Sequence, residues 1–122
     1  MSNFPQLDVK NATSGVQLLS VKAIGASGAG SFYLPPNAVM REIIIFNTTA
    51  NAVTGGLKFG TSSGGTDVVA AQAVGASAFT FVSDATLLKR SFSTTAPQQI
   101  FYTAVGAWNS AVVNINIIYY QL

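Results

Sequence analysis

The alternation of hydrophobic and polar positions predicts two strands in the middle of the chain. Residues 43–46 form an uninterrupted β-branched and aromatic run that ends at a polar turn, a pattern typical of a central strand buried on both faces. In residues 53–60, Leu57 and Phe59 fall on one side and Lys58 on the other, as in a half-buried strand. A Gly/Ser/Thr-rich turn follows, and we interpret the whole region as a packing unit.

Four further segments alternate in a similar way and are predicted to be strands, namely residues 16–24, 76–83, 98–105 and 111–120. In the second of them, Phe79 and Phe81 face the same side. Residues 68–74 fit either a strand or one or two helical turns. A strand or an irregular edge is favoured, because Gly75 follows closely and leaves too few residues for a stable helix.

The connections between these segments are predicted from their turn residues. The Gly-rich residues 25–30 indicate a hairpin turn, since a phosphate-binding loop would need a helix to follow it and the next residues lead into Pro35 and Pro36. The two prolines predict a stiff corner that leads into the central strand. A short helix is predicted over residues 84–90, because an acidic residue begins the segment and two basic residues end it.

Together these elements predict an all-β fold, an antiparallel two-sheet sandwich that is jelly-roll-like, with about eight strands and one short helix near 84–90. Residues 16–122 are predicted to form a single β-sandwich domain. Residues 1–15 lack periodicity and are predicted to be an extended N-terminal arm. The arm is either a frayed terminus or a strap on a neighbouring subunit, with Phe4 and Leu7 as its apolar anchors.

Charge is sparse along the chain and changes the expected environment of these strands. Charged residues make up 8% of the sequence, whereas about 25–35% of the surface of a small soluble domain is commonly charged. Residues 91–122 contain no charged side chain, although edge strands are usually guarded by charge or proline. The last strands are therefore predicted to be central or covered by a partner. The apolar runs are shorter than the roughly 20 residues that cross a membrane, and the N-terminus lacks the pattern of a secretory signal. We expect burial against other protein chains and no membrane insertion.

The residue types leave little room for catalysis. The chain has no Cys and no His, which removes thiol nucleophiles, most zinc and haem sites, and the commonest general base near neutral pH. The four acids, Asp8, Glu42, Asp67 and Asp84, fall on separate predicted elements, so no carboxylate pair for glycoside hydrolysis is expected. The six basic residues are scattered, unlike a nucleic-acid footprint. We expect no enzyme activity, no metal, no cofactor and no nucleic-acid partner.

Four segments carry a resemblance to a known group of proteins: LPPNAV at 34–39, IIIFNTTANAVTGGL at 43–57, GGTDVVAA at 64–71 and AWNSA at 107–111. Through them, residues 34–120 resemble the small accessory virion proteins of tailed bacteriophages, which are head-decoration, head-fibre or fibre-tip modules built on compact β-sandwiches. The resemblance implies an oligomer, often a trimer, that is attached to a capsid or a tail. It implies no chemistry.

The function expected from sequence is that of a non-enzymatic structural virion protein. We expect it to decorate or stabilise a phage capsid, or to form a head fibre, as an oligomer for which a homotrimer is expected. The expected location is the capsid or tail surface of the virion, with assembly in the host cytoplasm. The alternative is a receptor- or glycan-binding tip module of a tail fibre, in which exposed aromatic rings touch the host surface. For Trp108 the competing interpretation is packing at a corner of the core. The candidate partner contacts are Phe4, Leu7, Trp108, Asn109, Tyr119 and Tyr120.

Overall fold

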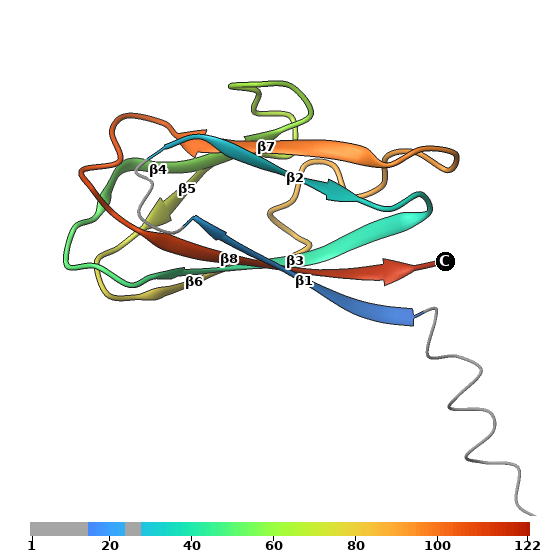
Figure 1. Cartoon of the computed structure of the whole chain (residues 1–122), viewed down its shortest axis with the longest axis horizontal. Coiled ribbons are helices and arrows are strands. Elements are labelled where there is room, and N and C mark those ends of the chain that lie inside the picture. The colour runs from blue at the N-terminus through green and yellow to red at the C-terminus, as the bar shows by residue number, and fades with distance from the viewer. Residues whose placement is uncertain (1–14, 24–27) are drawn as a thin grey trace, which may run out of the picture.

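The computed structural model of the chain describes residues 15–23 and 28–122, and these form two antiparallel sheets that lie face to face (Figure 1). One sheet has the strand order β1-β8-β3-β6 and the other has the order β2-β7-β4-β5. The prediction of an all-β, antiparallel two-sheet sandwich is thus confirmed. The strands are β1 (Gly15–Ala23), β2 (Gly30–Leu34), β3 (Ala38–Asn47), β4 (Val53–Gly60), β5 (Val69–Val74), β6 (Phe79–Val82), β7 (Gln98–Ala104) and β8 (Val113–Gln121).

The core lies between the sheets and is filled by every second side chain of the central strands. Ile115 and Ile117 of β8 are fully buried, as is Ile100 of β7 from the facing sheet. Burying one such side chain contributes about 2 kcal/mol to stability. The expectation that the uncharged last strands are central is confirmed, because β8 lies between β1 and β3 and β7 lies between β2 and β4.

Strand β3 departs from the prediction that it is buried on both faces. Ile43 and Ile45 are fully buried, but Ile44 and Phe46 are only half-buried and lie on the outer face of the sheet. Just before them the pairing with β8 skips Arg41, which is the extra residue of a β-bulge. A bulge reverses the alternation of the strand, so Arg41 and its neighbour Glu42 both lie outside the core.

The connection between β1 and β2 is not the predicted hairpin, since β1 pairs with β8 and β2 pairs with β7. The chain therefore passes from one sheet to the other here. Periodicity alone also missed β2, which is short and ends directly at the Pro35–Pro36 corner. That corner turns the chain back into the first sheet, and the backbone of Asn37 takes up the left-handed conformation (φ 64°).

The helix predicted over residues 84–90 does not form. The N–H groups of Thr86 and Leu87 both donate to the Ser83 carbonyl, which makes a single turn. The segment then becomes extended: the Leu88 N–H donates to the Val68 carbonyl, and the Arg90 carbonyl accepts from the Met40 N–H. Seven residues are too few to nucleate a stable helix in isolation, and here the neighbouring strands offer backbone partners that a helix would have forgone.

Candidate interaction surface

Three phenylalanines gather on the outer face of the β1-β8-β3-β6 sheet, and we call Phe46, Phe79 and Phe81 the aromatic patch. Phe46 of β3 lies opposite Phe79 of β6 in the strand register. Their rings stack at 4.3 Å between centroids, and the ring of Phe81 stacks on that of Phe79 at 6.4 Å. Phe79 and Phe81 are 62% and 60% exposed, so the patch presents large aromatic surface to the surroundings.

The patch arises because β6 is a short edge strand with aromatic residues on its outward positions. Its sequence is Phe-Thr-Phe-Val, in which Val82 is fully buried in the core. Within the described part of the chain, β6 is hydrogen-bonded as a strand only to β3. It lacks the Lys, Glu or Pro that usually discourages pairing at an open edge.

Four charged residues lie before the patch on β3 and after it on the chain that follows β6, and we call Arg41, Glu42, Asp84 and Arg90 the charged rim. Glu42 lies two residues before Ile44 on β3, and Ser83 follows β6 directly. A shallow pocket of about 150 Å³ is lined by Arg41, Glu42, Ser83 and Asp84. The Asp84 carboxylate also lies 3.6 Å from the Arg90 guanidinium, with both side chains about half exposed.

The sequence placed all four acids apart, whereas the structure brings Glu42 and Asp84 to one pocket. Two carboxylates in one pocket are a requirement for glycoside hydrolysis, but the reaction also takes place in a site from which water is excluded. Here the pocket is open, Arg41 shares its lining, and Asp84 is paired with Arg90. This arrangement suits charge pairing at a surface.

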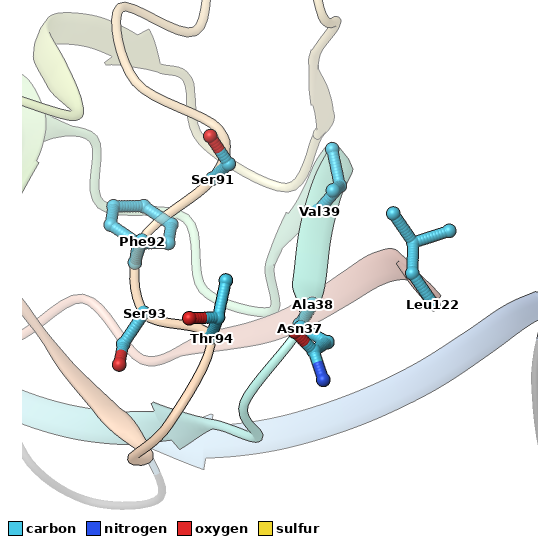
Figure 2. Close-up of a pocket in the computed structure, with 8 residues that line it drawn as sticks. All are labelled: Asn37, Ala38, Val39, Ser91, Phe92, Ser93, Thr94 and Leu122. Carbon is cyan, nitrogen blue, oxygen red and sulfur yellow. The ribbon is translucent and has the colours of Figure 1, made fainter.

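A second pocket, of about 200 Å³, lies where β3 begins (Figure 2). Its lining comes from the start of β3, from the segment before β7 and from the last residue of the chain. Backbone hydrogen bonds join these walls, including one from the Asn37 N–H to the Ser93 carbonyl at 2.9 Å. The pocket contains hydroxyl groups but no acid or base to activate them. The lining residues are Asn37, Ala38, Val39, Ser91, Phe92, Ser93, Thr94 and Leu122.

Asp67 has a structural task in the β4–β5 loop. Its carboxylate accepts hydrogen bonds from the Thr61 hydroxyl at 2.6 Å and from the Thr61 N–H at 2.8 Å. These bonds favour the charged form and hold the pKa of Asp67 below its ordinary value of 3.8. The carboxylate closes the Gly-rich loop on itself, as turn chemistry predicts.

Trp108 and Asn109, predicted as partner contacts, make contacts with other residues of the same chain at one end of the sandwich. The Trp108 ring is half-buried against the core and meets the Tyr102 ring edge-on, with 6.5 Å between centroids. Burial there raises the pKa of the Tyr102 hydroxyl. The Asn109 amide donates to the Ala52 carbonyl at 3.0 Å and to the Thr54 hydroxyl, which ties two loops together. Corner packing is therefore the interpretation that the contacts favour.

The other predicted contacts are not brought together with Trp108. Tyr119 is partly buried and packs against the core. It lies near the last residue of β8, whereas Trp108 precedes the first. Tyr120 faces outward, where the Arg41 guanidinium lies 5.8 Å from its ring centroid in a cation–π arrangement. Of the predicted contacts that the structure describes, Tyr120 is the one that touches the charged rim. Phe4 and Leu7, and the arm that carries them, lie outside the described residues.

Within residues 15–23 and 28–122, no three His, Cys, Asp or Glu side chains gather as metal ligands. The same part of the chain contains no helix long and apolar enough to cross a membrane. Comparison of the chain with protein-family models, with curated proteins and with solved structures gives no match in any of the three.

The aromatic patch was missed as a partner surface because the run at 43–46 was interpreted as buried on both faces. The signal was present in the alternation itself. Outward positions on two adjacent strands, Ile44 and Phe46 on one and Phe79 and Phe81 on the other, are all apolar. A sheet that faces water normally carries polar side chains at such positions.

Proposed function

We propose that the protein is a non-enzymatic structural component of a tailed-bacteriophage virion. It decorates or stabilises the capsid, or forms a head fibre, as a homotrimer assembled in the host cytoplasm. Its partners are copies of itself and another virion protein, held through apolar and backbone contacts and without a cofactor. The proposal starts from the sequence resemblance to small accessory virion proteins.

The observation that carries this function is the exposed aromatic patch on the outer face of one sheet of the sandwich. Large apolar side chains exposed together mark interaction sites rather than ordinary surface. The two pockets described above offer charge pairing and hydroxyl groups, and their linings contain no buried acidic, basic or nucleophilic side chain set for turnover. A binding role accounts for both features.

The strand order supports a jelly-roll topology for the domain. The orders β1-β8-β3-β6 and β2-β7-β4-β5 alternate the early and late strands of the chain between neighbours. Such an arrangement results when a long antiparallel hairpin is rolled into two four-stranded sheets, as in the jelly rolls of viral capsid proteins. Fold alone does not assign function, so this topology adds to the proposal without carrying it.

The alternative, a receptor- or glycan-binding tip, has less support. It needs exposed rings at Trp108, Tyr119 or Tyr120. Trp108 and Tyr119 pack against the core, and the Arg41 guanidinium lies over the Tyr120 ring. Trp108 therefore presents no free indole face on which a sugar could stack.

Co-sedimentation with capsids tests the proposed function. The purified full chain, mixed with capsids assembled without it, is expected to pellet with them at a saturable ratio. Whole host cells and a glycan array serve as the comparison, and no retention is expected on either. Binding to cells or glycans together with no binding to capsids would contradict decoration and favour the tip module.

A further inference from the structure

We propose that copies of this chain associate with one another through the aromatic patch, with the charged rim beside it in the same interface. This inference deepens the proposed function, because it names the surface that holds the proposed oligomer together. It is independent of what the oligomer is attached to. A protein that bound capsids as single copies would contradict the inference and leave decoration intact.

The charges around the patch favour a protein as its partner over a membrane surface or a nucleic acid. A membrane surface or a nucleic acid is recognised by an excess of Lys and Arg around the contact. The charged rim instead has two bases, Arg41 and Arg90, and two acids, Glu42 and Asp84. Its formal charge is zero, so the rim gives neither an anionic surface nor a polyanion a net attraction.

A neutral rim of mixed sign is also self-complementary. When the same surface of every copy meets at a symmetry axis, each group must find a suitable partner among the groups of an identical surface. Phe79 and Phe81 can stack on the same residues of another copy without desolvating a charge. Beside them, around a three-fold axis, the bases of each copy can face the acids of the next copy, so that every rim meets groups of opposite sign.

The patch has the place and size of an interface core. A Phe side chain buries roughly 200 Å², so two rings about 60% exposed present roughly 250 Å² per copy. A stable interface takes about 800 Å² per partner, and its apolar centre is usually surrounded by a polar rim. The half-buried Ile44 and Phe46 extend the apolar centre. Along β3 and after β6, the charged rim then borders this centre.

The edge of β6 supplies a second reason for a copy of the same chain. Its backbone groups are hydrogen-bonded to β3 on one side, and it is the last strand of its sheet. An open edge without charge or proline is a template for pairing with another strand. A closed oligomer that covers β6 removes this liability on every copy at once.

Sedimentation of a double variant tests the patch. Phe79→Thr with Phe81→Thr removes both exposed rings and keeps β-branched side chains suited to a strand. We expect the dissociation constant of the oligomer to rise by about 100-fold or more, with an unchanged far-ultraviolet circular dichroism spectrum. Tyr33→Thr is the matched control, since Tyr33 is 58% exposed on β2, the edge strand of the other sheet. A double variant that associates as tightly as the control overturns the proposal.

Charge reversal tests the rim without touching the rings. One variant carries Arg41→Glu and Arg90→Glu, and the other carries Glu42→Lys and Asp84→Lys. Each variant alone has a rim of one sign and is expected to sediment as single copies at low salt. The equimolar mixture is expected to recover part of the association, because opposite rims then meet at two of the three contacts of a trimer. Equal association of all three samples, or failure of the mixture to recover it, contradicts the presence of the rim in the interface.

Discussion

At the scale of single residues, the Asn47 side chain holds two loops together at one end of the sandwich by hydrogen bonds. It is fully buried, and its amide donates to the Asn51 carbonyl at 2.7 Å and to the Gly75 carbonyl at 3.0 Å. Its side-chain oxygen accepts from both the N–H and the hydroxyl of Thr49. All of its hydrogen-bonding capacity is therefore used, which is the condition under which a buried polar side chain is stable.

The variant Asn47→Asp tests this role with almost no change of shape. A carboxylate keeps the acceptor bonds from Thr49 but places negative charge against the two carbonyl oxygens that the amide served. Since a buried charge without a donor is costly, we expect a loss of about 3 kcal/mol or more in the free energy of unfolding. Urea denaturation at pH 7 and fixed protein concentration measures it.

Asn109→Asp is the control for that substitution, because Asn109 also donates to a carbonyl but is exposed. Water compensates a group lost at such a position, and a change of under about 1 kcal/mol is expected. Equal losses for the two variants would show that burial of Asn47 is not what matters. The sequence indicated only a polar turn at this point, since the Gly75 carbonyl that Asn47 meets lies on a distant loop.

At the scale of elements, alternation predicted most strands and failed where neighbours decide the outcome. The segments around β4, β7 and β8 have one apolar and one polar face, so their strand character and orientation follow from sequence. The 84–90 segment has the charge distribution expected of a short helix, yet its backbone is hydrogen-bonded to Val68 and Met40. The sequence of the segment itself does not reveal partners that lie so far away in the chain. The aromatic patch was hidden for a related reason, because an apolar run looks the same whether a sheet or a partner covers it.

Strand β4 contains an irregularity at Gly55 and Gly56, which both have positive φ. Gly56 has a positive φ of 81°, and the pairing of β4 with β5 shifts register beside it. A Cβ at this position would lie 2.1 Å from the Gln72 carbonyl oxygen, closer than van der Waals contact allows. The backbone of β5 can approach β4 there only because residue 56 has no side chain.

Replacing Gly56 by Ala is therefore expected to lower stability by two separate effects. Positive φ costs an L-residue about 1–2 kcal/mol, and the clash with β5 adds to it. Gly64→Ala separates the two, because Gly64 has a similar φ of 76° with no atom within 4 Å of the added Cβ. In thermal unfolding, the Gly56 variant is expected to melt clearly below the Gly64 variant. Equal melting temperatures would mean that the close approach of β5 contributes nothing.

At the scale of the whole molecule, the low charge of the chain and its two-sheet sandwich both indicate that the chain has more apolar side chains than its core buries. The chain of 122 residues has apolar residues for a core and also for part of one outer face. The core uses the inward positions of both sheets, and the surplus appears on β3 and β6 as the aromatic patch. The sequence predicts burial against other protein chains, and we propose the patch as the place where that burial occurs.

The solution mass of the purified full chain tests self-association most directly. Sedimentation equilibrium at micromolar concentration is expected to give three copies of the 12.7 kDa chain, about 38 kDa, because each copy covers its aromatic patch with another. A mass of two copies would keep the interface and contradict the three-fold arrangement. A single species of 12.7 kDa at every concentration, with Phe79 and Phe81 left facing water, would contradict self-association through the patch.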